Sequence, residues 1–143
     1  MIFLDKRRIA KRKGQALVEL ALTLPLILLL ILGAMDFGRL FYTKLVLTNA
    51  AREGANYLAY HPDDKEIAKQ VAVEEAISLG MSLKIENVII EPDDETCCDM
   101  GQPITVKATV TIQLIFGGFF QAIGLTESSS IDLNGVSKMM VQV

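Results

Sequence analysis

Cys97 and Cys98, the only two cysteines, are adjacent residues that can form a disulfide with each other or bridge to a second molecule. Their Cα atoms lie about 3.8 Å apart across a trans peptide, whereas disulfides usually need about 4.4 Å or more. A disulfide between these two residues is therefore strained, although an oxidising compartment outside the cytoplasm would favour some oxidation. Both pairings stay open.

Acidic residues surround this cysteine pair and raise the question of a metal site; they are Asp93, Asp94, Glu95 and Asp99. Their spacing fits neither an EF-hand loop nor a zinc site, so we expect an acidic loop exposed to solvent. The sole histidine, His61, precedes a helix-ending proline, and we expect a structural role for it. The chain has neither a nucleophile–histidine–acid set nor a phosphate-binding glycine loop. The sequence therefore predicts no enzyme, no cofactor and no metal site.

Glu19 is the only charged residue between Ala16 and Met35. At 1.5 Å per residue this run extends about 30 Å, the thickness of the hydrocarbon core of a bilayer. Its many Leu and Ile residues contribute roughly −3 to −6 kcal/mol of insertion free energy, which outweighs Pro25 and one acid near the edge. We therefore predict a membrane-spanning helix. A carboxylate in this setting needs a charged partner or must reach water at the interface, and the residues alone leave both open.

The charges on the two sides of this helix are opposite in sign. Six of the 14 basic residues precede the apolar run, whereas the chain beyond Asp36 is strongly acidic. Basic residues beside a membrane helix stay in the cytoplasm, because moving them across the membrane is unfavourable. We predict a cytoplasmic leader at residues 1–14, a transmembrane helix at 15–36 and an extracytoplasmic domain at 37–143. The lipid bilayer is then a partner, and nucleic acid is not, since an acidic domain repels phosphates.

Helical character is predicted to continue past the span to about Tyr60, because no proline occurs between Pro25 and Pro62. Small residues recur along this part of the helix and would let another helix or a sheet approach closely. They are Ala50, Ala51, Gly54, Ala55 and Ala59.

A second helix is predicted after Pro62. Asp63 resembles an N-cap, with Glu66 three residues later as in a capping box. The helix is expected to reach Leu79 and to stop at Gly80. Its amphipathic pattern is marked by Ile67, Val71, Ala72, Glu75 and Leu79.

The rest of the chain has the pattern of strands. Lys84 to Glu91 is rich in Ile and Val, and Ile104 to Leu114 alternates apolar with polar residues, the period of a half-buried strand. Phe119 to Leu125 is a short apolar stretch. Ser129 to Gln142 reads as a last strand, in which Asn134-Gly135 predicts a bulge or a tight turn. A long helix and a second helix packed on an antiparallel sheet of about three strands give an α+β fold.

The segment Gly14-Gln15-Ala16-Leu17-Val18-Glu19 joins the basic leader to the apolar helix. It resembles the processing site of type IV pilins, where a membrane aspartic peptidase cleaves after the glycine. Glycine suits an extended, unhindered backbone at such a cut. The resemblance implies that a prepilin peptidase removes the leader and leaves Gln15 as the new N-terminus. It also implies that the Glu19 carboxylate pairs with the terminal ammonium of a neighbouring subunit and fixes the register between helices.

Three blocks at fixed separation resemble the TadE-like family: residues 14–25, 36–41 and 49–55. TadE-like proteins are pseudopilins, or minor pilins, of the Tad machinery, which assembles Flp-type pili for adhesion and biofilm formation. The resemblance covers about the first 60 residues and implies a pilin-like fold, with other pilins and Tad assembly proteins as partners. Leu20 stands where major Flp pilins have tyrosine, and those pilins are much shorter. An accessory subunit is therefore expected.

We expect this protein in the inner (cytoplasmic) membrane as a single-pass, N-in/C-out protein, with the extracellular pilus as a second location. An alternative function is that of an uncleaved single-pass protein whose extracytoplasmic domain binds a ligand or a partner protein. The two functions differ in the N-terminus of the native chain.

Overall fold

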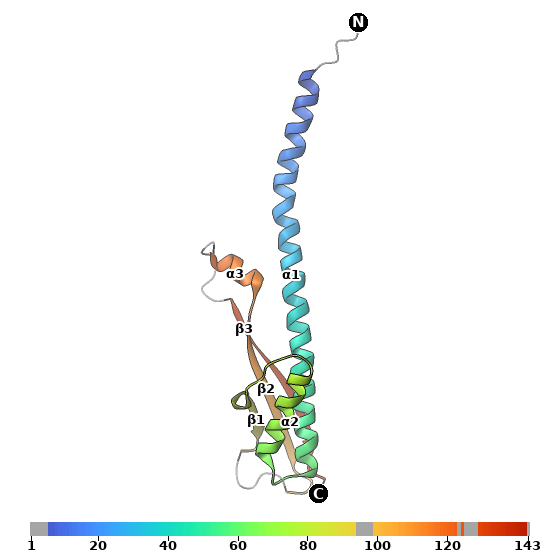
Figure 1. Ribbon diagram of the computed structural model, residues 1–143, viewed down its shortest axis with the longest axis vertical. Helices are drawn as coiled ribbons and strands as arrows, with labels where there is room; N and C mark the ends of the chain where they lie inside the picture. The colour runs from blue at the N-terminus through green and yellow to red at the C-terminus, as the bar shows by residue number, and fades with distance from the viewer. Residues whose placement is uncertain (1–5, 94–98, 123, 125–128, 143) are drawn as a thin grey trace.

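The computed structural model describes residues 6–93, 99–122, 124 and 129–142 of the chain. One very long helix, α1 (Lys6–Tyr60), runs through it, and a small domain packs on the C-terminal half of this helix (Figure 1). The N-terminal half of α1 extends away from the domain. The helix ends at Tyr60, as the position of the next proline predicts.

The core of the domain lies where α1 meets α2 and the sheet. Leu47 and Leu58 of α1 are fully buried there against Ile104 and Val106 of the sheet. The small residues singled out in α1 are all buried as well, which confirms that they mark a packed face. At Gly54 a Cβ atom would lie 3.0 Å from a main-chain oxygen of α2, so the two helices approach each other closely.

Helix α2 (Lys65–Ser78) lies beside α1 and buries a row of alanines, Ala68, Ala72 and Ala76. The predicted apolar pattern is partly wrong, because Ile67 is 44% exposed and Val71 is only half-buried. The small side chains of these alanines, together with Gly54 of α1, allow the axes of α1 and α2 to lie close together. The larger side chains of α2 therefore lie at the edge of the contact.

The two ends of α2 differ in how well the sequence predicts them. The predicted capping box is wrong: Asp64, not Asp63, is the N-cap residue, and its side chain makes no capping hydrogen bond. Its main-chain carbonyl instead accepts the amide of Ala68 at 3.0 Å. The predicted stop is correct, because Gly80 follows the helix with a φ of +78°, a conformation that favours glycine.

The sheet contains three antiparallel strands in the order β1 (Val88–Glu91), β2 (Pro103–Gln113) and β3 (Ser130–Met140). Ile104, Val106 and Ala108 of β2 are buried, which confirms the period of two. The first predicted strand is shorter than expected, because Ile85–Asn87 forms a 3-10 turn before β1. The predicted α+β fold, with a second helix and a three-stranded antiparallel sheet, is confirmed.

Asn134 and Gly135 form neither the bulge nor the turn that their types predict. They lie inside β3 in an uninterrupted register, opposite Thr109 and Ala108 of β2. Helix α1 crosses the sheet at this point, and a Cβ atom on Gly135 would overlap the main-chain carbonyl of Leu47. Glycine is therefore used here for a close approach of two backbones, not for a change of direction.

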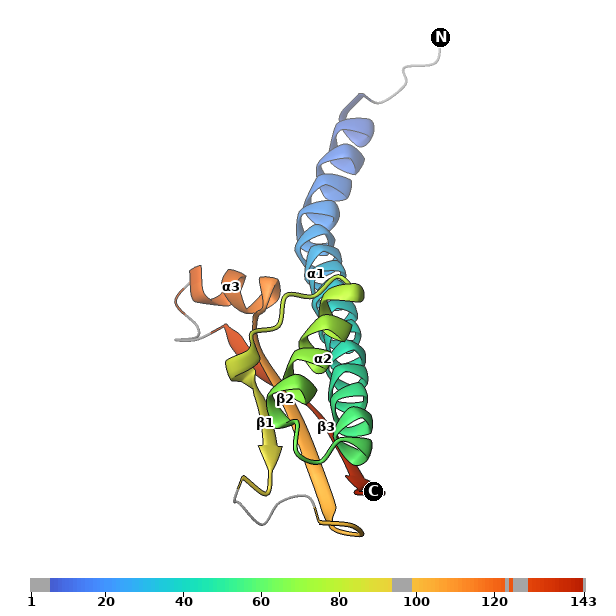
Figure 2. The same cartoon turned by 60° about the horizontal axis from the view of Figure 1, so that its bottom comes forward.

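The chain between β2 and β3 forms a third helix, α3 (Ile115–Ala122). The sequence predicts only a short apolar stretch at 119–125, so the prediction missed both the helix and its start. Helix α3 lies beside the middle of α1, at the end of the sheet nearest the N-terminal half of that helix (Figures 1 and 2).

Candidate processing and assembly site

Gly14 lies inside α1, well away from the folded domain, and its surroundings are open. A Cβ atom built there meets nothing within 4 Å among the described atoms. The backbone is helical at this point, so the extended conformation expected at a cut is not the one the chain adopts. Because glycine weakens a helix interior by roughly 0.5–1 kcal/mol relative to alanine, this is a place where α1 can unwind at low cost.

Glu19 lies on the same exposed part of α1, five residues beyond Gly14. At about 100° per residue, the two residues are separated by about 140° around the helix axis. The main-chain carbonyl of Glu19 accepts a hydrogen bond from Thr23 Oγ1 at 2.9 Å. Its carboxylate has no partner among the described residues, and it is surrounded along the helix by apolar side chains.

The apolar run of α1 is exposed along almost its whole length. Leu22, for example, is 74% exposed, and Leu30 is 64% exposed. No residue between Ala16 and Met35 is buried. In a water-soluble helix such an all-round apolar surface would be covered by protein. By length and composition, α1 is the one helix among the described residues that could cross a membrane.

Burial begins at Asp36, directly after the apolar run. This side chain is 5% exposed, and both of its carboxylate oxygens accept main-chain amides at the start of α3. Ile115 N–H donates to Oδ1 at 3.0 Å, and Phe116 N–H donates to Oδ2 at 2.6 Å. The first amides of an α-helix generally lack a carbonyl acceptor within the helix, so Asp36 of α1 caps the first turn of α3. Sequence reasoning missed this role, since nothing local links residue 36 to a helix 79 residues away.

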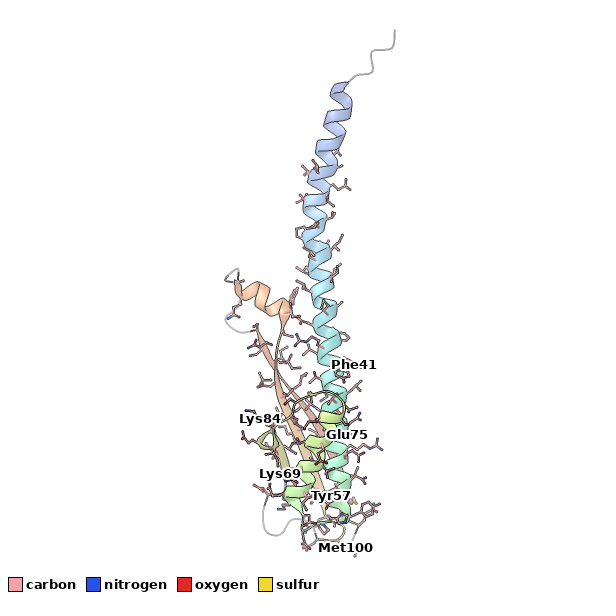
Figure 3. The ribbon with its side chains drawn as sticks, viewed as in Figure 1. Phe41, Tyr57, Lys69, Glu75, Lys84 and Met100 are labelled. Carbon is pink, nitrogen blue, oxygen red and sulfur yellow. The ribbon has the colours of Figure 1, made fainter. Side chains whose placement is uncertain are left out.

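One face of α1 stays exposed beyond Asp36. Phe37 and Phe41, one turn apart, are 70% and 58% exposed, and their rings stack with centroids 6.4 Å apart. Phe41 lies on the side of α1 away from the sheet (Figure 3). Further along, Arg52 and Glu53 are exposed while their neighbours Ala51 and Gly54 are buried. In residues 49–55, one face of α1 is therefore buried in the domain core and the opposite face is exposed.

The remaining candidate residues are Cys97, Cys98 and His61. Cys97 and Cys98 lie outside the described residues, so both pairings stay predictions. His61 stacks on Tyr57 with ring centroids 4.5 Å apart, and its Nδ1 lies 3.2 Å from the Tyr57 carbonyl oxygen. Within the part of the chain that the structure describes, no three His, Cys, Asp or Glu side chains gather in a way that could hold a metal ion.

Comparison with known protein families gives a match that confirms the resemblance seen in the sequence. The family model described as TadE-like protein matches residues 14–56. This range contains all three resembling blocks and ends inside α1, so it includes none of the sheet. The similarity to this family extends over 43 of the 143 residues of the chain. Neither the search of curated proteins nor the search of solved structures gives a match.

Proposed function

We propose that this chain, whose residues 14–56 match the TadE-like family, is a minor pilin or pseudopilin of a Tad-type apparatus. In this proposal the leader 1–14 is cytoplasmic, residues 15–36 span the inner membrane and residues 37–143 form the extracytoplasmic domain. A prepilin peptidase cleaves between Gly14 and Gln15, and the mature protein helps to assemble Flp-type adhesion pili together with other pilins and Tad proteins.

The observation that carries this proposal is the change of surroundings along one continuous helix. From Ala16 to Met35 the helix is apolar and uncovered, and from Asp36 to Tyr60 one of its faces is buried in the domain. A rigid rod of this kind can pack beside copies of itself through its first half while it holds a folded domain on its second half. This arrangement suits an assembly subunit, because the helix alone determines where each domain lies along the fibre axis.

Glu19 gives the uncovered half a specific point of contact. A carboxylate amid apolar residues is unfavourable in the membrane unless it finds an opposite charge. Cleavage after Gly14 would create such a charge, the ammonium of Gln15. The register follows from the axial distance between Gln15 and Glu19 along one helix, which is about 6 Å for four residues at about 1.5 Å each. A Gln15 ammonium can meet the Glu19 carboxylate of a neighbour when that neighbour is displaced along the axis by roughly this distance.

The function is tested in a host that carries a Tad apparatus and lacks this chain. We expect few or no surface pili without the chain, normal pili when it is restored, and the tagged protein in the membrane or sheared-pilus fraction. The alternative of an uncleaved protein that captures a ligand predicts normal piliation in its absence. Normal pili in the deleted strain, with the restored protein outside both the pilus fraction and any Tad complex, would refute the proposed role.

A further inference from the structure

Helix α3 is apolar, and none of its residues whose burial the structure describes is buried in the domain core. No charged residue occurs between Leu114 and Leu125, and the helix begins with Ile115, which is 42% exposed. The sequence places the four large apolar residues of α3 at positions 115, 116, 119 and 120. At 100° per residue these positions fall within about 140° around the helix. An apolar arc of this width is the pattern of a helix that lies against an apolar phase.

Asp36 fixes the level of α3 along α1. The two hydrogen bonds from Ile115 and Phe116 hold the start of α3 beside the residue that ends the apolar run. Helix α3 then extends sideways from α1, between the folded domain and the apolar half of the long helix (Figures 1 and 2). The β2–β3 connection is thus placed where the proposed membrane surface would meet the domain.

A groove of about 410 Å³ opens between α3 and α1 on the side of the apolar run. Phe116 lines one wall, and all other lining residues belong to the proposed span; they are Leu24, Pro25, Leu28, Leu29, Ile31 and Leu32. Phe116 therefore shares one continuous apolar surface with residues that lie up to twelve positions before Asp36. Exposure of such an apolar surface to water is unfavourable.

We propose that α3 is a second membrane anchor, an interfacial helix that lies in the outer leaflet of the bilayer beside the transmembrane part of α1. Lipid acyl chains occupy the groove between α3 and α1. The groove continues the surface of the proposed span, which favours lipid over a second copy of the chain as its occupant. The inference depends on the proposal that α1 spans the membrane. Its consequence is that the domain is held against the bilayer at two points, which restricts its rotation about α1.

The chain contains no tryptophan, so single tryptophans report the depth of chosen positions. Three variants of the full chain are needed: Ile115→Trp in α3, Leu28→Trp in the apolar run and Met100→Trp at the far end of the domain. Met100 is 74% exposed and lies at the end of the domain opposite to α3 (Figure 3). Each variant is reconstituted at one copy per phosphatidylcholine nanodisc, with plain or brominated acyl chains. Fluorescence quenching by bromine and by aqueous iodide is then measured.

We expect brominated lipid to quench Ile115→Trp and Leu28→Trp, and iodide to quench only Met100→Trp. If Leu28→Trp is quenched by bromine while Ile115→Trp behaves like Met100→Trp, α1 spans the membrane but α3 is not an anchor, and this inference is overturned. If Leu28→Trp itself escapes bromine, the proposed membrane span fails as well. Protection of Ile115→Trp from iodide that appears only with several copies per disc would assign the groove to a second copy, and would also overturn the inference.

Discussion

Gly135 of β3 lies with its main chain directly against the main chain of Leu47 in α1, and a side chain on residue 135 has no room there. This contact fixes how closely the long helix lies over the sheet. Both residues are fully buried or nearly so, and the strand continues through the contact without a break in its register. The close approach of α1 to the sheet at this point therefore requires glycine at position 135.

Gly135→Ala is expected to destabilise the domain by about 3 kcal/mol, because the added methyl group must push α1 and β3 apart. At about 4–8 °C per kcal/mol for a domain of this size, calorimetry of the detergent-solubilised chain should show a Tm at least about 12 °C lower.

Gly38→Ala is the matched control for this substitution, since the same methyl group at residue 38 meets nothing within 4 Å. Its stability should be unchanged or higher by up to about 1 kcal/mol, because alanine favours the helix. Gly54→Ala, with neighbours at 3.0 and 3.1 Å, should fall between the two. Equal Tm values for Gly135→Ala and Gly38→Ala would show that the backbones are not in contact.

Asp36→Asn should loosen α3 while leaving the rest of the domain folded. Asparagine can accept a hydrogen bond from only one of the two amides and presents an N–H group to the other. The expected loss is about 1.5–3 kcal/mol, the contribution of a hydrogen bond to a charged group. Hydrogen exchange at the amides of Ile115 and Phe116 is expected to become about tenfold faster or more, since 1.4 kcal/mol corresponds to tenfold.

Glu53→Gln is the control for the change at Asp36, because Glu53 is an exposed acid on the same helix. Exchange within α3 should not change in this variant. If Asp36→Asn also leaves the Ile115 and Phe116 amides as slow as before, then the carboxylate does not cap α3.

The parts of this structure that depend on periodicity could be predicted from the sequence, and the parts that depend on distant contacts could not. The alternation of apolar and polar residues correctly predicted strand β2. The position of Pro62, the first proline after Pro25, correctly predicted the end of α1. The residue types of Asn134 and Gly135 indicated a bulge or a tight turn, because the sequence does not show that α1 crosses β3 there. The sequence likewise shows that Asp36 follows the apolar run, but it does not show that its carboxylate contacts the start of α3, because the two are 79 residues apart in the chain. In α2, burial follows the alanines, since helix spacing and not side-chain size decides which row faces α1.

The proposed role of Glu19 predicts that cleavage and assembly can be separated. Glu19→Ala should still be cleaved, because Gly14 is unchanged, but it should enter pili much less than the unsubstituted chain does. Pulldown of a tagged copy with an untagged copy, and blotting of sheared pili, measure the loss. Glu53→Gln again serves as the control and should assemble normally. Loss of cleavage in Glu19→Ala, or full assembly without the carboxylate, would contradict the role assigned to this residue.

The intact mass of the chain purified from a host with an active prepilin peptidase tests the central claim most directly. We expect a protein that begins at Gln15 and is recovered from the membrane or pilus fraction, and a Gly14→Leu variant that keeps its leader. Gly33→Leu, a change of the same size at another open glycine of α1, should be processed normally. A native chain that retains Met1 in such a host would contradict the account.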